Sequence, residues 1–495
     1  MYKLKTAITL IVKGAATVAV ASGAGILVVK YVMDSLHANV GLEKPTKKQI
    51  QEEDPKQHAL FRHLPQLKGQ IAWRKLGNFP TPIHHGKYYP PNGKEILNFY
   101  VKREDMSSTI YGGNKVRTLQ HQLAVCEAKD PTKKIYVTGT GGSNQILATI
   151  VHGYKQLKLK ILPLWMSKDV PDLDNTLNML SSLSFIGDAG VTWANMFSVL
   201  RLMLVGIFSD DCFVLPPGGN NPAGVLGQVG GLLELAEQIQ RQEVPDPDGI
   251  FLPIGSSCTI TGLIIGVALC RHLDLPVFKS KAFTIHGIPI HHVIANASRS
   301  LNFYKASWSQ YIPLSILHSI VKTCEQIQIA GGPDLKSQAI NILDKHCTIH
   351  DSAELIGLYG GHSKISKDTA SQYDKFGDSI RDHKGMAQKP LWLCGHFAAK
   401  AFAQMTLELR KDRSKKYIFW QTKSAVQPRG TKDEWKYFQD MPDGVHKWAN
   451  KGKAHSILRQ GKVNTDGGDA SGYRHLMTQV VDSNTDPPVF DQAKI

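Results

Sequence analysis

Cysteine is scarce in this sequence and follows no spacing known for metal binding or redox chemistry. The seven cysteines among the 495 residues contain no CxxC pair. An odd and scattered set argues against a disulfide framework and favours a reducing compartment. The histidine pairs at 84–85 and 291–292 and the Cys-Gly-His run at 394–396 have no partner pair at a recognised ligand spacing. The sequence therefore predicts no metal site.

The sequence is also short of acidic residues, with 42 Asp and Glu against 58 Lys and Arg and a net charge of +16. This surplus suits anionic partners such as nucleic acid, anionic lipid or acidic protein surfaces, but it equally describes a solvated surface rich in lysine. The sequence has no Walker-type loop, nucleophile elbow, pair of catalytic acids or known nucleic-acid reader motif. It therefore contains no clear nucleic-acid module.

The N-terminal 37 residues include one long apolar run. Residues 6–29 carry a single charge, Lys13. About 24 residues at roughly 1.5 Å each would span the hydrocarbon core, so residues 1–37 are predicted to hold a single-pass membrane helix. Lysines lie on both sides of the run and leave its orientation open. A removed presequence is the main alternative, since the first acid is Asp34, although the absence of arginine argues against it. A buried hairpin is the third interpretation.

Two further segments flank the globular body, which is predicted to span residues 71–428. Residues 38–70 are polar and rich in proline and charge, as expected of a linker. Residues 429–495 mix aromatic and basic side chains with Gly and Asp and have few apolar runs. Such an extension is typical of a strap or docking segment that becomes ordered on another surface. Binding of nucleic acid by this extension is the alternative.

Within the body, one local pattern recurs: an apolar run, a Gly-rich turn and then a helical pattern. It occurs at 96–101 with a helix from Asn114, at 134–137 with the turn 139–144, and at 250–254 with the turn 255–259. This alternation predicts an α/β fold of parallel strands joined by crossover helices. The turns direct backbone N–H groups at the space above the strand ends, which suits an anionic ligand. Any strand-to-helix connection can use Gly and Ser in this way, so a purely structural role is the alternative for each turn.

Several ordered motifs resemble a known enzyme family. These are Tyr-Val-Lys-Arg-Glu-Asp-Met-Ser-Ser at 100–108, Gly-Gly-Asn-Lys-Val-Arg at 112–117, Gly-Ser-Asn-Gln at 142–145, and Pro-Gly-Gly-Asn-Asn-Pro-Ala-Gly at 217–224. Together they resemble the D-cysteine desulfhydrase and 1-aminocyclopropane-1-carboxylate deaminase family. The resemblance implies a two-lobed, tryptophan synthase beta-like fold with parallel sheets flanked by helices. It also implies a smaller lobe at about 110–230 inserted in a larger one, and a homodimer.

The resemblance further implies a pyridoxal phosphate site. The cofactor would be bound covalently by Lys115, and catalysis would use Lys115 and Ser143. Both the N-terminal end of a helix and burial lower the pKa of a lysine at position 115 and favour the nucleophilic amine. A surface lysine that opens a helix is the alternative. The remaining implied contacts are Asn144 to the cofactor ring, the phosphate turn of Gly255, Ser256, Ser257, Cys258 and Thr259, and Ser143, Asn144 and Gln145 to the substrate.

The sequence departs from this family where side chains would face the ligand. Relatives have a GSGGT-like phosphate turn, and Ser257 and Cys258 replace its two later glycines. Relatives also have Tyr and then Thr or Glu where this chain has Phe397 and Ala398. A second tyrosine is displaced by one position, to Tyr359, and the closing Thr-Gly-Gly reads Thr-Lys-Ser at 422–424. Since turn-forming residues persist while ligand-facing ones change, the pattern predicts a retained fold with relaxed chemistry.

Two functions follow from these observations. The first is a catalytically degenerate accessory or structural subunit of a membrane complex, expected in the mitochondrial inner membrane, with protein partners and contact with anionic lipid. The second is an active, membrane-tethered deaminase or desulfhydrase that acts on a small amino acid similar to D-cysteine or aminocyclopropane-carboxylate. Retention of Lys115 and Ser143-Asn144-Gln145 favours the enzyme, whereas the lost side chains favour the subunit. In either case pyridoxal phosphate can remain as a ligand that stabilises the fold.

Overall fold

The computed structural model describes most of the predicted globular body. The described residues are 40–52, 58–91, 95–166, 173–187, 192–193, 211–290, 314–357, 361–376, 379–424 and 426–453. The predicted membrane helix in residues 1–37 and the end of the C-terminal extension beyond residue 453 lie outside this part. None of the helices in the described ranges has both the length and the apolar character needed to cross a bilayer.

The larger of two sheets has six strands in the order β1-β2-β10-β7-β8-β9. All neighbouring strands are parallel except β1 and β2, which pair antiparallel. The expectation of parallel sheets therefore fails at this edge, because β1 and β2 follow each other through a short connection that allows only a hairpin. The strands are β1 (Ile83–Tyr88), β2 (Leu97–Lys102), β7 (Gly249–Ile254), β8 (Thr284–Pro289), β9 (Cys347–Ile349) and β10 (Tyr417–Trp420).

The smaller sheet has four parallel strands in the order β5-β4-β3-β6. They are β3 (Lys134–Thr140), β4 (Lys160–Met166), β5 (Thr192–Trp193) and β6 (Cys212–Leu215). Every residue of β6 is buried, as expected of a parallel strand covered on both faces. The chain thus contains the two sheets predicted from the resemblance, with all strands of the second lying between residues 134 and 215 of the chain.

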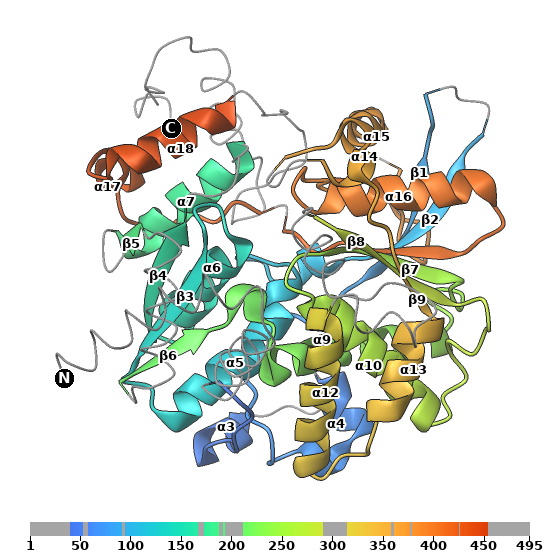
Figure 1. Ribbon diagram of the computed structural model, residues 1–495, viewed down its shortest axis with the longest axis horizontal. Helices are drawn as coiled ribbons and strands as arrows, with labels where there is room; N and C mark the ends of the chain where they lie inside the picture. The colour runs from blue at the N-terminus through green and yellow to red at the C-terminus, as the bar shows by residue number, and fades with distance from the viewer. Residues whose placement is uncertain are drawn as a thin grey trace, which may run out of the picture.

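Helices cover both faces of the larger sheet (Figure 1). On one face lie α9 and α10 with α12 and α13, and on the other lie α14, α15 and α16. The helix α5 runs between the two sheets and packs on α9. The helices are α5 (Asn114–Lys129), α6 (Asn144–Thr149), α7 (Leu173–Ile186), α9 (Pro222–Gln240), α10 (Cys258–His272), α12 (Leu314–Ile329), α13 (Lys336–Lys345), α14 (Ala353–Ile356), α15 (Lys364–Asp374) and α16 (Ala398–Lys411), and α6 continues as a π-helix (Ile150–Gln156).

The described part of the predicted linker is packed on the body. The helix α4 (Ala59–His63) lies against α9, and Leu60, Phe61 and Leu67 are fully or almost fully buried. A shorter helix, α3 (Lys47–Glu52), is held by the side-chain amide of Gln49, which donates to the Ala124 carbonyl. The segment differs from a free linker because its apolar side chains, few but spaced along helices, complete the core beneath α9.

The described part of the C-terminal extension is also docked. The helices α17 (Glu434–Gln439) and α18 (Asp443–Lys453) lie on α7 beside the smaller sheet (Figure 1). Phe438, Val445 and Trp448 are buried in the same core as the strands of that sheet. This part of the extension therefore docks on the body of its own chain.

Candidate active site

The lysine predicted to bind the cofactor opens α5 at the ends of β2 and β10. Gly113, immediately before this helix, has a φ of +104°. A Cβ atom at this position would lie 2.7 Å from the carbonyl oxygen of Thr422, and the next residue, Asn114, donates its backbone N–H to that same oxygen at 3.0 Å. Only glycine lets the start of α5 approach the end of β10 so closely. This contact fixes where the side chain of Lys115 begins.

Lys115 lies in a largely neutral environment. Its Nζ donates to the carbonyl oxygen of Gly218 at 2.8 Å, and the side chain is partly buried. Burial lowers the pKa of Lys115, while the nearby thiol of Cys258 acts in the opposite direction. The first turn of α5 adds a positive potential that also disfavours the ammonium form. The amine at position 115 is therefore easier to deprotonate than that of an exposed lysine, which is what a nucleophilic role would require.

A buried ion-pair network holds α5 in place behind Lys115. The guanidinium of Arg117 donates to Glu104 at 2.6 Å and to Glu234 on α9 at 2.9 Å. Lys102 also binds Glu234, at 2.5 Å. Each of these side chains is at most 4% exposed, so the charges are compensated within the protein rather than by water. Lys102 and Glu104 of the Lys-Arg-Glu-Asp run thus help to position α5, while Arg103 and Asp105 pair with each other.

The predicted phosphate turn joins β7 to α10. Ser257 has a φ of +71°, a left-handed conformation that costs a non-glycine residue roughly 1–2 kcal/mol. Its hydroxyl lies 2.9 Å from the Ser315 hydroxyl on α12, and the Cys258 thiol lies 3.8 Å from the Thr118 hydroxyl on α5. The turn therefore adopts, at Ser257, a left-handed backbone conformation that favours glycine. The two side chains that replace those glycines are engaged on neighbouring helices.

The phosphate turn and Lys115 lie next to each other. The side-chain amide of Asn114 donates to the Thr259 hydroxyl at 2.8 Å. The Ser256 hydroxyl donates at 3.1 Å to the same Gly218 carbonyl that accepts from Lys115. The first N–H groups of α10 have no partner further back in their own helix, and the helix dipole makes this end favourable for an anion. The predicted lysine and the predicted phosphate turn thus form one site.

The third predicted motif, at 143–145, borders the same space. Ser143 caps α6, its hydroxyl accepting from the backbone N–H of Ile146 at 3.4 Å. The side-chain oxygen of Asn144 accepts two hydrogen bonds, from the Tyr111 hydroxyl at 3.1 Å and from Asn178 at 2.9 Å. With its oxygen occupied, Asn144 keeps its Nδ2 group as the available donor. Neither Tyr111 nor Asn178 carries a sequence signal that could have indicated this role.

Gln145 is the clearest sign of a ligand. Its side chain is 3% exposed, and within the described part of the chain neither its Oε1 nor its Nε2 has a hydrogen-bond partner. Gln145 faces the 217–219 turn, since a Cβ atom on Gly219 would lie 3.4 Å from its Oε1. A buried amide without partners costs about 1–3 kcal/mol per group, so a bound polar molecule would relieve a real penalty.

The altered position 397 also borders the site. The ring of Phe397 comes within 3.6 Å of the point where a Cβ atom on Gly255 would lie. Phe397 stacks on His396 with ring centroids 4.1 Å apart, and the next residue, Ala398, is fully buried. Neither Phe397 nor Ala398 has a polar side-chain atom to offer a ligand. The displaced tyrosine, Tyr359, lies outside the described residues.

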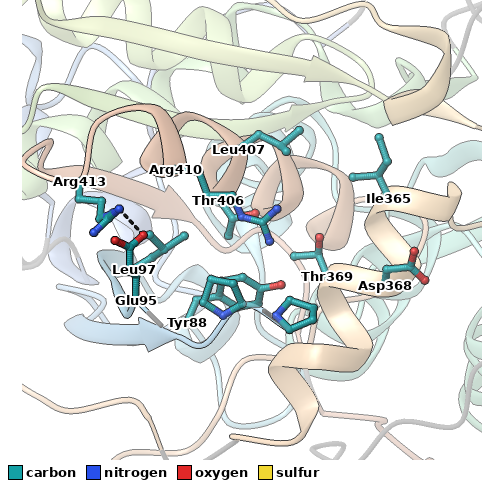
Figure 2. A pocket seen from close by; sticks show the side chains of 12 residues that line it. Tyr88, Glu95, Leu97, Ile365, Asp368, Thr369, Thr406, Leu407, Arg410 and Arg413 are labelled. Atoms are coloured by element: carbon teal, nitrogen blue, oxygen red, sulfur yellow. Dashed lines mark ion pairs between the residues drawn. The ribbon is translucent and has the colours of Figure 1, made fainter. Parts of the chain in front are cut away.

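The described chain also contains a cavity of about 640 Å³ between β1, β2, α15 and α16 (Figure 2). Its wall includes Tyr88, Arg410 and an ion pair of Arg413 with Glu95. None of the predicted site residues lines this cavity. It is therefore separate from the candidate site. Across the described ranges no group of three His, Cys, Asp or Glu side chains is arranged to hold a metal ion.

Comparison with known families shows which family the chain carrying this site belongs to. The sequence model of the family described as "Pyridoxal-phosphate dependent enzyme" matches residues 75–346, more than half of the chain. The chain belongs to this family. The match includes Lys115, the 143–145 motif and the 255–259 turn, and it ends before Phe397.

Curated relatives within the pyridoxal-phosphate dependent family carry two related names. A putative 1-aminocyclopropane-1-carboxylate deaminase of Pyrococcus abyssi is 27% identical over 43% of this chain and 62% of its own length. A bifunctional D-cysteine desulfhydrase and 1-aminocyclopropane-1-carboxylate deaminase of Arabidopsis thaliana, described as mitochondrial, is 30% identical over 39% of this chain and 50% of its own. The chain thus matches less than two thirds of each. A solved structure of an ACC deaminase homologue has a TM-score of 0.49 and 20% identity, covering 74% of this chain and 94% of its own.

The residues present fit pyridoxal phosphate. The amine of Lys115, the N-terminal end of α10 and the Nδ2 of Asn144 would hold its aldehyde carbon, its phosphate and its ring oxygen, respectively. The amide of Gln145, which has no hydrogen-bond partner among the described residues, adds a polar group that a bound ligand would satisfy. The elements for binding are therefore present, while the ring nitrogen would find no polar partner at Ala398.

Proposed function

We propose that the chain is a pyridoxal phosphate-binding protein with strongly reduced catalytic power, which serves as an accessory subunit of a membrane complex. One observation carries the proposal: Lys115 and the phosphate turn are assembled, yet Phe397, which borders that turn, has no proton to transfer. A site that keeps its binding groups and loses its proton donor is expected to bind the cofactor but to convert substrate slowly.

The chemistry of the site defines what has been lost. When bound, pyridoxal phosphate withdraws electrons from the α-carbon of an amino acid. The protein must then accept and return protons at defined atoms, and a positioned side chain contributes typically 10²–10⁴-fold to such a step. Lys115 supplies an amine for one transfer. Phe397 cannot supply a second, and Ala398 cannot hold a proton on the ring nitrogen.

The first test is a comparison of binding with turnover. Purified full-length protein is mixed with pyridoxal phosphate, and the visible band, the adduct retained after borohydride reduction and the release of pyruvate or 2-oxobutyrate from D-cysteine or 1-aminocyclopropane-1-carboxylate are measured. We expect a stable adduct with turnover at least 100-fold below 1 s⁻¹, the low end of ordinary enzymes. The variant that carries Phe397→Tyr and Ala398→Thr should gain turnover without gaining affinity.

The second candidate is an active deaminase or desulfhydrase, and Gln145 favours it. A buried amide without a hydrogen-bond partner in the described part of the chain suits a substrate carboxylate as well as a cofactor. Turnover near 1 s⁻¹ by the unaltered protein would establish this function and contradict the proposed loss. Absence of both the band and the adduct would contradict both candidates and leave a scaffold without cofactor.

We also propose that residues 6–29 anchor the protein in a membrane, with the mitochondrial inner membrane as the expected location. Full-length protein should resist alkaline carbonate extraction from mitochondria and retain its N-terminus by peptide mapping. Each arginine at the centre of a membrane helix costs about 2.5–3.5 kcal/mol, so a variant with Val18→Arg and Val20→Arg should become extractable. The Lys30→Arg variant, altered at the end of the run, should remain in the pellet. Extraction of the unaltered protein, or a cleaved N-terminus, would contradict the anchor.

A further inference from the structure

Residues 426–448, here called the strap, connect the end of the larger sheet to the helix that borders the smaller one. The strap follows β10 and then lies along α7 (Figure 1). The backbone N–H of Gly430 donates to the Ser184 hydroxyl at 2.7 Å, and that of Lys432 donates to the Ser184 carbonyl at 2.9 Å. A Cβ atom on Gly430 would overlap that carbonyl, so a glycine is needed for the strap to reach α7.

The strap is joined to the candidate site by a chain of buried amides. Gln427 lies with its Nε2 2.6 Å from the Ser181 hydroxyl and 3.4 Å from the Oδ1 of Asn178. The Nδ2 of Asn178 in turn donates to the Oδ1 of Asn144 at 2.9 Å and to the Gly142 carbonyl at 3.0 Å. Gln427 and Asn178 are each 1% exposed, so water does not compete for these bonds.

The end of the strap contacts the same turn a second time. The six-membered ring of Trp448 lies against Gly141, and a Cβ atom there would be 2.8–3.1 Å from three of its carbons. Trp448 is 2% exposed and belongs to the core of the smaller sheet. Gly141 lies in the turn that carries Ser143 and Asn144. The strap therefore contacts this turn in two ways, through Gln427 and Asn178 of α7 and through the ring of Trp448.

We propose that Gln427 and Trp448 are positioning residues that orient Asn144 toward the cofactor. Gln427 fixes the amide of Asn178, and Asn178 occupies the Oδ1 of Asn144 together with the hydroxyl of Tyr111. The amide of Asn144 can then present only its Nδ2 as a free donor, which suits the ring oxygen of pyridoxal phosphate. Gln427 lies at the end of the predicted body and Trp448 lies in the C-terminal extension, so the strap that joins the two thereby becomes part of the site. This inference rests on the proposed cofactor binding.

The test uses full-length variants and two readouts. Gln427→Leu removes the amide, and Trp448→Ala removes the ring from Gly141. The matched control is Phe438→Leu, since Phe438 is also a buried strap residue and its ring packs on His446 within the strap. We expect the Kd for pyridoxal phosphate to rise at least tenfold in both test variants and less than twofold in the control, although all three should lower the Tm. Equal Kd values in all three would reduce the strap to a stabilising element and overturn the proposal.

The second readout is independent of the cofactor. Hydrogen exchange of the peptide covering residues 139–148 is measured in protein without added cofactor, where loss of positioning should speed exchange at least tenfold in the two test variants but not in the control. If the unaltered protein binds no pyridoxal phosphate, the proposed function fails, but this measurement still decides whether the strap orders the turn. Unchanged exchange in Gln427→Leu and Trp448→Ala would overturn the proposal.

Discussion

Substitution of Lys115 by methionine should abolish the covalent adduct with pyridoxal phosphate completely. Methionine keeps the length and much of the volume of the side chain but has no amine to bond the aldehyde. The Gly218 carbonyl would lose one of its two donors and keep the Ser256 hydroxyl, so the local structure should survive. Borohydride reduction followed by intact mass measurement should show one added cofactor in the unaltered protein and none in Lys115→Met.

The control for this experiment is a lysine on the same helix. Lys129 ends α5, is exposed, and lies about four turns from the site. Lys129→Met should retain the adduct and the visible band. An adduct that persists in Lys115→Met would show that another lysine binds the aldehyde, with Lys423 as the first to examine because it is buried beside Gly113. That result would contradict the assignment of Lys115.

Local sequence patterns were sufficient to predict the elements that carry the site. Each apolar run followed by a Gly-rich turn became a strand and a helix, and the helix predicted from Asn114 begins there. The third helix was predicted from Gly262, whereas α10 begins at Cys258, inside the segment predicted as a turn. The reason is physical: strand composition, turn residues and helix periodicity are all encoded within about 30 residues of chain. The resemblance supplied the further expectation that Lys115 and the 255–259 turn lie together, and the contacts through Gly218 and Thr259 agree with it.

The contacts that orient the site could not be predicted in this way. Asn144, Asn178 and Gln427 are far apart in the chain and meet only because the strap packs on α7. The sequence around an asparagine or glutamine in a helix or a loop contains no pattern that predicts such a role. The two replaced glycines illustrate the same limit, since the sequence shows that Ser257 and Cys258 stand at these positions but not what their side chains contact. Their engagement on α12 and α5 depends on the position of those helices.

The antiparallel edge and the docked linker were missed for related reasons. The strand β1 contains two histidines, a glycine and a lysine, so its composition resembles a loop more than a strand. Its backbone is held as a strand by pairing with β2 and by the bridge between His85 and Arg381. In residues 38–70 the many polar side chains obscured a small set of apolar ones that complete an existing core. In both cases the rest of the fold, rather than local propensity, determines the structure.

Acid should destabilise this protein through histidines that are buried in their neutral form. Burial lowers the pKa of His84 and His121 from 6.5 to about 4, with Arg103 adding to the effect on His84, and burial together with His350 lowers the pKa of His286 to about 3. In the unfolded chain these rings take up protons below about pH 6.5, whereas in the folded protein they stay neutral. Unfolding is therefore coupled to proton uptake, and stability present above pH 6.5 is lost progressively as the pH falls toward the folded pKa values.

The expected size of this effect is large compared with typical domain stability. At pH 5 each of the three rings lies about 1.5 units below its unfolded pKa, which corresponds to about 2 kcal/mol each and roughly 6 kcal/mol together. Urea unfolding at pH 7.5 and pH 5.0 should show a loss of this order. His286→Leu should flatten the dependence by about 2 kcal/mol, because the leucine cannot take up a proton in the unfolded chain. Equal urea midpoints for the unaltered protein at the two pH values would show that these histidines are protonated equally in the folded and unfolded states.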